Sequence, residues 1–373
     1  MRIAFYAPMK PPDSPVPSGD RTIARSLMKV LEHCGHEVKL ATRFQSREPA
    51  GDPARQWALR REGEAVVSRL VREFTSTVRP DLWFTYHVYY KAPDWIGPLV
   101  AEELGIPYVA AEVSHAPKRA GGPWDVNHRQ VEKTIMEANL VIGLNSLDAG
   151  CVRPLLAKPE TLIQLRPFMD SPPDHRGHRE DLRRTLSGEF GLPREVPWLF
   201  TAAMMRPGAK QKSYDLLACA LRRQKDIKYR LIIAGDGPVR PDIEKAFEEL
   251  PACFLGERDS TELFSLMAAS DLFVWPAVNE AYGMALLEAH SQGLPVVAGE
   301  AGGVRDIVRH DETGVLTPVG DAAAFSEVVF GLCRDPLRLE RMSRRARLIF
   351  SQDHTLEVAT AKLAPALEAL VNG

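Results

Sequence analysis

Short apolar runs alternate with longer amphipathic segments along the first half of the chain. The runs RIAFYAP, EVKLATR, DLWFTYH, PYVAAEV and NLVIGLN have the length and composition of buried strands. The spacing of apolar residues between these runs predicts helices over 22–33, 60–78, 95–105 and 128–137. This alternation predicts a parallel sheet with helices on both faces.

The alternation stops between residues 165 and 197. The stretch RPFMDSPPDHRGHRE is rich in proline and charge, which is typical of a linker, and one short helix is expected after it. A second series follows, with strands WLFTAAMM, YRLIIAGDG, CFLG, LFVWPA and PVVAGE. Helices are predicted over 214–223, 242–250, 260–269, 283–292 and 304–308, and an amphipathic helix that can pack on either lobe follows from residue 354.

The predicted fold is therefore α/β, with two Rossmann-like, doubly wound parallel-sheet lobes. The first domain is expected over 1–172 and the second over 190–352, with a C-terminal helix over 353–373 that could return to the first lobe. Because ligands of open parallel sheets bind beyond the carboxyl ends of the strands, a cleft between the lobes is the expected site.

Composition narrows the class of protein. The 373 residues include 47 basic and 49 acidic side chains, and a net charge of −2 gives no general attraction for nucleic acid. The five cysteines are scattered without a Cys-x-x-Cys pair, as expected for reduced thiols in the cytoplasm. No run has the length of a signal peptide or a membrane span, and peripheral contact with the inner face of a membrane stays open.

The stretch NEAYGMALLEAH follows the strand LFVWPA directly. A helix is predicted to begin at Gly283, which would expose unpaired amides of Gly283, Met284 and Ala285. Such amides bind anions, and phosphate above all. Glu280 precedes them and Glu288 follows inside the helix, so one carboxylate could accept hydroxyls of a sugar and the other those of a ribose. A solvated helix face and a charge near the helix dipole explain the two residues equally well.

Two further loops of the second lobe carry chemistry. Arg206, Lys210 and Lys212 fall in MMRPGAKQKSYDLL, in a predicted loop between a strand and a helix, where basic groups can neutralise a leaving diphosphate. Lysines in loops are more often merely solvated. In IAGDGPVR, Gly235 allows a tight turn, but Arg240 replaces the last glycine of a dinucleotide fingerprint.

The first lobe offers weaker candidates. Gly19 and Asp20 open its first helix and could face a ligand, although an ordinary Ser or Asp helix cap is an equal alternative. His87 and His115 each follow a predicted strand, where a histidine is more often a satisfied polar residue than a catalyst. No phosphate loop, His-Glu-x-x-His, Gly-x-Ser-x-Gly or Asp-x-Asp motif occurs, so neither a metal nor a bound cofactor is expected.

Taken together, NEAYGMALLEAHSQGLPVVAGEAGGVRDIV resembles the Glu, seven residues, Glu signature of family-four retaining glycosyltransferases, which have the GT-B fold. In that family a Gly-x-Pro-Val-Val strand and a Gly-Gly loop follow the signature. LIIAGDGP, VLTPVGD and the spacing of Arg206 to Lys212 fit the same pattern, and PSGDRTIARSL lies where the family has its first glycine-containing loop. The resemblance implies an acceptor-binding first domain and a donor-binding second domain.

The resemblance also implies a role for each matching position. Glu280 would hold hydroxyls of the donor sugar, Glu288 would bind the ribose, and Arg206 and Lys212 would hold the diphosphate. The family's Gly-Arg-Leu is here MMRPG, its Lys-Gly is Lys212-Ser213, and its interdomain motif is RPFMD. Glu112, His87 and His115 compete for the first-lobe catalytic position, with His115 the one carried forward. The implied donor-binding set is Gly19, Asp20, Gly235, Asp236, Ala281, Tyr282, Gly283, Met284, Ala285 and Glu288.

The implied reaction is a hexosyl transfer in glycan biosynthesis, from a nucleotide-diphosphate sugar to an acceptor hydroxyl, with retention and without a metal. The nucleotide sugar is a co-substrate, and no cofactor is implied. The acceptor could be a glycan, a lipid-linked glycan or a small molecule. Two alternatives remain: a nucleotide-sugar epimerase on the same fold, and a nucleotide-sugar binding protein without catalysis.

Overall fold

A computed structural model describes residues 1–16, 18–175 and 177–372. The chain divides into two compact units, which we call the first unit, Met1–Arg166 with Leu356–Gly373, and the second unit, Pro167–Thr355. The segment 167–189, which the sequence divided between the first domain and a linker, therefore belongs to the second unit. Gly373, the last residue of the predicted C-terminal helix, lies outside the described residues.

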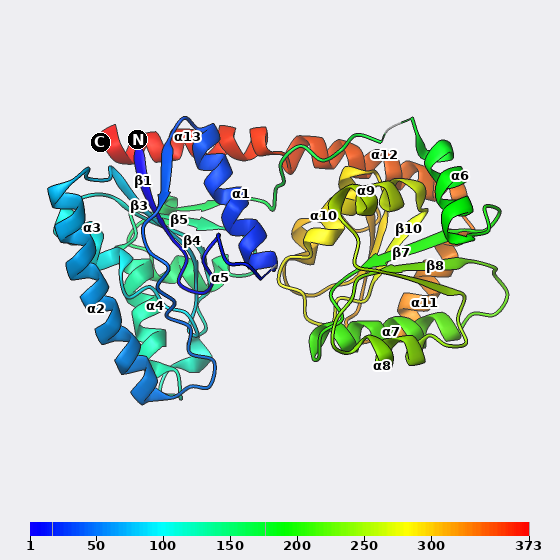
Figure 1. Cartoon of the computed structure of the whole chain (residues 1–373), viewed down its shortest axis with the longest axis horizontal. Helices are drawn as coiled ribbons and strands as arrows, with labels where there is room; N and C mark the ends of the chain where they lie inside the picture. The colour runs from blue at the N-terminus through cyan, green and yellow to red at the C-terminus, as the bar shows by residue number, and fades with distance from the viewer. Residues whose placement is uncertain (17, 176, 373) are drawn as a thin grey trace. The chain divides into compact units, whose positions relative to one another are not determined.

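The first unit is built on a six-stranded parallel sheet (Figure 1). Its strand order is β2-β1-β3-β4-β5-β6, which reverses direction beside β1 as a doubly wound sheet does. Five strands were predicted, and the short β6 was not. The strands are β1 Arg2–Tyr6, β2 Glu37–Leu40, β3 Leu82–Val88, β4 Tyr108–Val113, β5 Leu140–Gly143 and β6 Leu162–Gln164.

Helices cover both faces of this sheet. Figure 1 shows α2, α3 and α4 on one side and α1 with the C-terminal α13 on the other, and α1 contacts α13 directly. Helix α2 begins earlier than predicted because Asp52 caps it and Pro53 occupies its first turn. The helices are α1 Gly19–His33, α2 Pro53–Ser76, α3 Gly97–Leu104, α4 Asp125–Glu137, α5 Ala149–Val152 and α13 Leu356–Asn372, with short 3₁₀ turns η1 Pro117–Arg119, η2 Arg153–Leu155 and η3 Pro159–Thr161.

One buried carboxylate ties this unit together. Asp94 accepts hydrogen bonds from the hydroxyls of Thr85 on β3 (2.6 Å) and Tyr108 on β4 (2.9 Å). It also accepts the amides of Ile96 (2.8 Å) and Gly97 (2.7 Å) at the start of α3. Burial raises the pKa of Asp94, while these donors stabilise its charged form. The carboxylate thus fixes two strands and a helix start with respect to one another.

The second unit repeats the architecture with a parallel sheet in the order β12-β11-β10-β7-β8-β9. Aromatic and aliphatic residues of its central strands, such as Trp198, Phe200 and Phe273, are fully buried in one core. The two doubly wound sheets confirm the predicted fold class. The strands are β7 Trp198–Ala202, β8 Arg230–Ala234, β9 Ala252–Gly256, β10 Leu272–Trp275, β11 Val296–Gly299 and β12 Gly314–Thr317.

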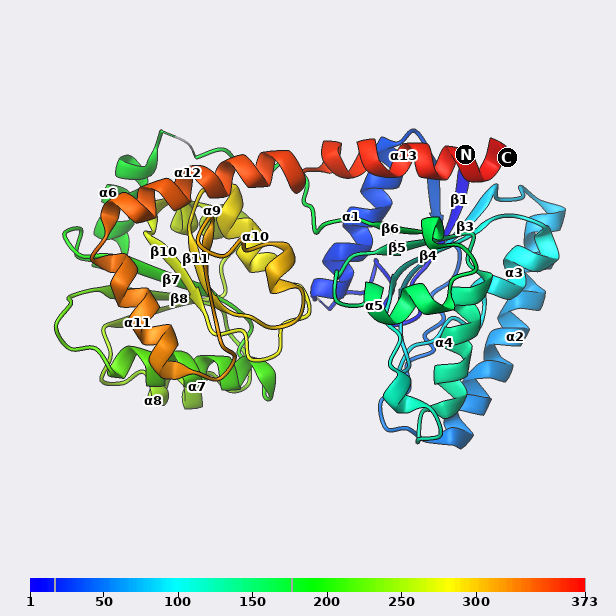
Figure 2. The ribbon, with the colours of Figure 1, turned by 180° about the vertical axis from the view of Figure 1, so that it is seen from behind.

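The helices of the second unit again lie on both faces, with α7, α8 and α11 on one side and α6, α9, α10 and α12 on the other (Figure 2). The prediction that Lys210 and Lys212 lie in a loop was wrong. Gly208 has φ +91° and ends the loop, so α7 begins at Ala209 and both lysines lie in its first turns. Strand β12 and the helices α11 and α12 were not predicted. The helices are α6 Arg179–Phe190, α7 Ala209–Arg222, α8 Arg240–Ala246, α9 Ser260–Ala269, α10 Met284–Ser291, α11 Ala322–Cys333 and α12 Pro336–Asp353, with the 3₁₀ turn η4 Gly302–Asp306.

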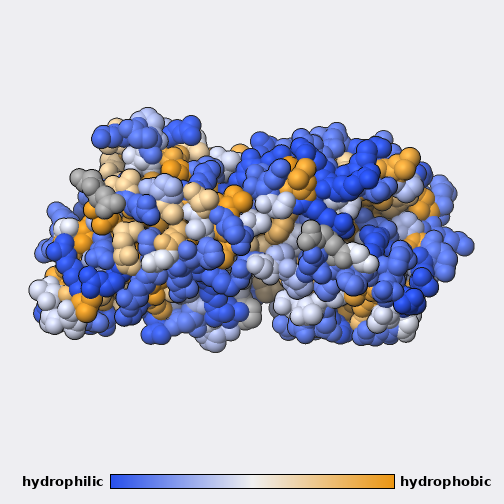
Figure 3. Space-filling model, turned by 90° about the horizontal axis from the view of Figure 1, so that it is seen from above, coloured by the Kyte–Doolittle hydropathy of each residue, from blue (hydrophilic) through white to orange (hydrophobic). Residues whose placement is uncertain are grey.

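The face of the molecule that Figure 3 shows is predominantly polar, and its hydrophobic residues are scattered in small groups. Within the described ranges, every helix is too short or too polar to traverse a lipid bilayer.

Candidate functional site

The loop between β10 and α10, residues 276–283, is fixed by glycines of the following segment. A Cβ on Gly302 would lie 2.0 Å from the carbonyl oxygen of Glu280, and one on Gly303 would lie 2.6 Å from that of Ala281. The amide of Gly303 donates to the Ala281 carbonyl at 2.9 Å. Gly302 also has φ +51°, which favours glycine. The Gly-Gly pair therefore lets two backbones touch, and this contact sets where Glu280 stands.

Helix α10 begins one residue later than predicted. Gly283 is its N-cap with φ +79°, and an added Cβ there would meet Leu286 Cδ1 at 2.9 Å. Met284 and Ala285 open the helix, and within the described part of the chain their amides donate to no backbone carbonyl. Ala277 in the same loop has φ +49°, a strained conformation for a residue with a Cβ. The loop thus presents free amides at a helix start, as an anion site requires.

The Glu280 carboxylate is held in one orientation by two donors. Lys210 Nζ donates to Glu280 Oε2 at 2.6 Å, and the indole Nε1 of Trp275 donates to the same oxygen at 3.2 Å. The Lys210 ammonium also lies 5.2 Å from the centre of the Trp275 ring, against which Tyr214 packs edge-on. The Glu280 side chain is only 15% exposed. Because both donors use Oε2, Oε1 can accept a hydroxyl of a ligand.

Lys210 is the residue whose role was not predicted. The sequence placed it in the basic cluster but gave the diphosphate roles to Arg206 and Lys212, and those two side chains are exposed beside the start of α7. Gly208 is the sequence feature that could have indicated the position of Lys210, because it marks the start of α7 at Ala209. In a helix that begins there, the side chains of Lys210 and Lys212 point in different directions. The structure thus pairs Glu280, a predicted site residue, with Lys210, for which no role was predicted.

Glu288 stands on α10 and is half-buried. Burial raises the pKa of its carboxyl to about 7. Among the described residues, no side chain or amide donates a hydrogen bond to this carboxyl group. It is therefore not the freely solvated helix face that one interpretation of the sequence offered, and a ligand with paired hydroxyls would supply the donors that the protein does not.

Gly235 and Asp236 shape the loop after β8. A Cβ on Gly235 would lie 2.1 Å from the Ala203 carbonyl oxygen, so the loops that follow β7 and β8 touch there. Asp236 accepts from the amide of Gly237 at 2.7 Å and from Arg240 at 2.9 Å, and the Gly237 amide lowers the pKa of Asp236 most. Gly235 and Asp236 thus shape the backbone of the loop after β8. Their contact with a nucleotide-sugar donor stays a prediction.

The carboxyl ends of β1, β3 and β4 carry the candidate residues of the first unit. His87 Nδ1 lies 3.0 Å from Asp20 Oδ1. His87 has φ +65° and Glu112 has φ +52°, and strained residues of this kind gather at functional sites. Burial opposes charging of His87, but the Glu112 and Asp20 carboxylates outweigh it and raise its pKa, while burial raises the pKa of Glu112. His87 lies within β3, one residue before its end at Val88, rather than after the strand, which corrects the prediction.

Gly19 and His115, two other predicted site residues of the first unit, lie in different surroundings. Ser18 caps α1 by accepting the Arg21 amide at 3.3 Å, and a Cβ on Gly19 would meet nothing within 4 Å. The cap is therefore a serine, and Gly19 adjoins open space. His115, by contrast, contacts Glu132 and the Cys151 carbonyl, each at 3.2 Å, rather than the groups around His87.

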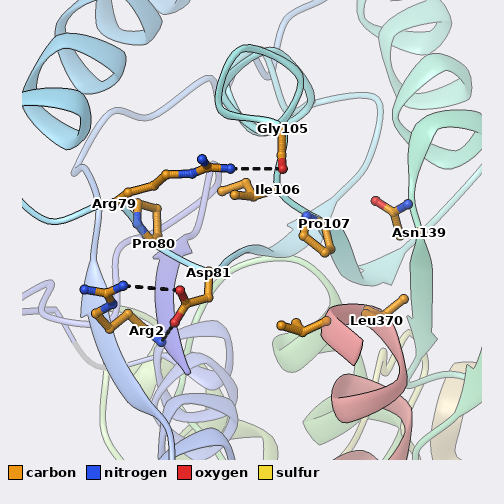
Figure 4. A pocket seen from close by; sticks show the side chains of 10 residues that line it. Arg2, Arg79, Pro80, Asp81, Gly105, Ile106, Pro107, Asn139 and Leu370 are labelled. Atoms are coloured by element: carbon orange, nitrogen blue, oxygen red, sulfur yellow. Dashed lines mark hydrogen bonds and ion pairs between the residues drawn. The ribbon is translucent and has the colours of Figure 1, made fainter. Parts of the chain in front are cut away.

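A pocket of about 620 Å³ opens at the other edge of the first sheet (Figure 4). Figure 4 shows Asp81 paired with Arg2, and Arg79 donating to the Gly105 carbonyl. Arg2 begins β1, and Asp81 and Asn139 directly precede β3 and β5, so the pocket lies at the amino ends of the strands. Since ligands of such sheets bind at the carboxyl ends, this pocket is not the candidate site.

Comparison with known proteins agrees with this geometry. Residues 200–349 match the family model described as glycosyl transferases group 1. A stretch of 114 residues is 41% identical to sulfoquinovosyl transferase SQD2 of Arabidopsis thaliana, and the match covers 30% of this chain but only 22% of that protein. D-inositol 3-phosphate glycosyltransferase 1 of Catenulispora acidiphila is 27% identical over 326 residues, which cover 78% of this chain and 72% of that protein.

Solved structures share the fold across the chain. The Anabaena protein HepE, solved in complex with UDP-glucose, has a TM-score of 0.71 at 19% identity and covers 99% of this chain and 100% of its own. Sucrose-phosphate synthase of Thermosynechococcus elongatus has a TM-score of 0.75 at 18% identity, with 100% and 99% covered. The fold is thus the GT-B fold, and residues 200–349 of the second unit are similar to the group 1 glycosyl transferases.

We expect Gly302→Ala to release the loop that carries Glu280. The added methyl would collide with the Glu280 carbonyl in a backbone conformation that alanine resists, at a cost of about 1 to 3 kcal/mol. Hydrogen exchange of the amides over 279–286 should become faster. Gly320→Ala is the matched control, because Gly320 has φ +86° but open space around it. Equal exchange in both variants would refute the backbone contact as the cause.

We expect Glu288→Gln to flatten the pH dependence of stability. Between pH 4.5 and about 7 the unfolded carboxyl is ionised while the folded one keeps its proton, so the free energy of unfolding of the native protein falls across this window. Allowing for solvent screening of a half-buried group, the fall due to Glu288 is about 1 to 2 kcal/mol. Urea unfolding at pH 4.5 and 8 measures it, with the exposed Glu327→Gln as control. An unchanged pH profile in Glu288→Gln would show that burial does not perturb this carboxyl.

Proposed function

We propose that the chain is a retaining glycosyltransferase that moves a hexose from a nucleotide-diphosphate sugar to an acceptor hydroxyl. The observation that carries this proposal is the placement of the Glu280 carboxylate. Lys210 and Trp275 orient it, and the Gly302 contact fixes its loop next to the free amides that open α10. A carboxylate beside an anion site suits a ligand that joins a sugar to a phosphate.

The donor's diphosphate would bind at the amides of Met284 and Ala285. The exposed cations of Arg206 and Lys212 would neutralise the charge that grows on the departing phosphate, and each such group can contribute about 3 kcal/mol to the transition state. This arrangement supplies positive charge to the diphosphate without a metal ion. The reaction breaks the bond between the sugar carbon and the phosphate oxygen and forms one to the acceptor oxygen, with the anomeric configuration kept.

The two carboxylates would hold the two ends of the donor. Hydroxyls of the transferred sugar would donate to Glu280, and the ribose hydroxyls would donate to Glu288, whose carboxyl has no donor among the described residues. The named relatives are transferases, which disfavours the epimerase and the non-catalytic binding protein. A glycan, a lipid-linked glycan or a small molecule remains the predicted acceptor, and a cytoplasmic location with peripheral membrane contact also remains a prediction.

Donor binding and product formation test this function directly. UDP-glucose is the first donor to try because HepE was solved with it, followed by the ADP and GDP sugars. A ligand at about a hundred times its dissociation constant stabilises the native state by about 2.7 kcal/mol, which a thermal shift resolves. NMR of the product should then show the donor's anomeric configuration. Stabilisation by no nucleotide sugar would contradict the proposal, and an epimerised donor without acceptor would support the epimerase.

We expect Lys212→Ala to lower kcat by about a hundredfold at saturating donor, while the melting temperature changes little because the side chain is exposed. Lys245→Ala, an exposed lysine on α8, is the control and should keep full turnover. Turnover is measured with the donor that the thermal shifts identify. Undiminished turnover in Lys212→Ala would remove this residue from the diphosphate site.

A further inference from the structure

Three side chains of the first unit converge at a place that the proposed reaction does not use. His115 follows β4, and His128 and Glu132 stand one turn apart on α4. Their ligating atoms all lie within 4.8 Å of one another. His115 and His128 are buried and their rings stack at 5.0 Å, while Glu132 is half-buried. Two imidazoles and a carboxylate form a donor set that zinc prefers.

Two of the distances within the cluster match an edge of a coordination tetrahedron. Glu132 Oε1 lies 3.2 Å from His115 Nε2 and 3.3 Å from His128 Nε2. When ligands bind a metal at about 2.0 to 2.1 Å in a tetrahedron, neighbouring ligand atoms stand about 3.3 Å apart. Both contacts therefore have the length of a tetrahedral edge.

The hydrogen bonding of the two rings points the same way. His115 Nδ1 lies 3.2 Å from the Cys151 carbonyl oxygen. Because a carbonyl oxygen can only accept a hydrogen bond, this contact places a proton on Nδ1. In a neutral His115 the lone pair of Nε2 then faces the Glu132 carboxylate, a contact that a cation bound between the two atoms would stabilise. An imidazolium that donates from both nitrogens is the arrangement without a metal. A backbone carbonyl bound to the far nitrogen is how metal-binding histidines are commonly oriented.

His128 supplies an independent observation. It is 1% exposed, and neither ring nitrogen has a hydrogen-bond partner among the described residues, although Nε2 is close to Glu132. An unsatisfied polar group in the interior costs about 1 to 3 kcal/mol. A metal ion bound to Nε2 would remove part of this cost.

We propose that His115 Nε2, His128 Nε2 and a Glu132 carboxylate oxygen bind a zinc-class divalent cation, with a fourth position for water or a ligand oxygen. The ion would join the segment after β4 to α4, two parts of the first unit that are otherwise separated by the 3₁₀ turn η1. The site is distinct from the diphosphate-binding groups of the second unit. It was not foreseen because His115 stands 13 positions before His128, outside the compact metal-binding motifs.

Cobalt substitution tests the site without reference to activity. Tag-free protein, stripped with a chelator, is titrated with Co²⁺, which gives intense visible absorption when it is four-coordinate. We expect one Co²⁺ per chain, displaced by one Zn²⁺, and a rise in melting temperature with either ion. His128→Asn and Glu132→Gln should each weaken binding at least tenfold. His33→Asn, an exposed histidine on α1, should leave binding unchanged.

The alternative is a hydrogen-bonded cluster without a metal. Absence of four-coordinate Co²⁺ in the wild-type protein would establish that alternative and overturn the proposal. Equal affinity of the wild type and of folded His128→Asn or Glu132→Gln would also overturn it, because the ion would then lie elsewhere. If neither variant folds, the stoichiometry and coordination spectrum of the wild type decide: one tight four-coordinate site supports the proposal, and none refutes it.

Discussion

The candidate site of the second unit depends on a contact between two stretches of backbone. Three glycines of one segment approach the loop after β10: a Cβ on Gly299 would lie 1.9 Å from the Pro276 carbonyl oxygen, and Gly302 and Gly303 would meet Glu280 and Ala281 at similar distances. None of the three has room for a side chain. These glycines therefore allow the two backbone segments to pack directly against each other. This contact sets the positions of Glu280 and of the free amides at the start of α10.

Within this frame the two glutamates have different electrostatic surroundings. Glu280 faces the Lys210 ammonium and the Trp275 indole, which hold its carboxylate in one orientation. Glu288 has no such partner among the described residues, and burial raises its pKa to about 7. A buried carboxyl group without hydrogen-bond donors is costly to ionise. Hydroxyls of a ligand that donate to it would stabilise its charged form, because they supply the hydrogen bonds that its surroundings lack. The side chain of Glu280 is thus held in place by the protein itself, whereas the carboxyl of Glu288 would obtain its hydrogen bonds from a ligand.

Much of the fold followed from periodicity, and the limits of that method are specific. Helix α9 was predicted with its observed bounds, and in the structure Asp259 and Glu262 form a capping box at its start. The start of α7 was missed because its N-cap, Gly208, makes no side-chain cap hydrogen bond and is a weaker signal than Ser, Asp or Asn, and the partner of Glu280 was missed with it. Strand β6 has only three residues, too few for a pattern. Contacts such as Lys210 with Glu280, or His115 with Glu132, join residues far apart in the chain, and no local rule predicts them.

The sequence left three residues of the first unit competing for one role, and the structure shows that their surroundings differ. Which of them has that role stays a prediction. His115 contacts the Cys151 carbonyl oxygen through Nδ1 and Glu132 through Nε2, so both ring nitrogens are engaged within its own cluster. Glu112 is buried in a strained conformation, and burial raises its pKa, which favours the neutral acid. His87 alone of the three combines a raised pKa with a carboxylate at 3.0 Å, that of Asp20 at the start of α1. The positive φ angles of His87 and Glu112 are the structural cost of keeping both groups near the carboxyl ends of β3 and β4.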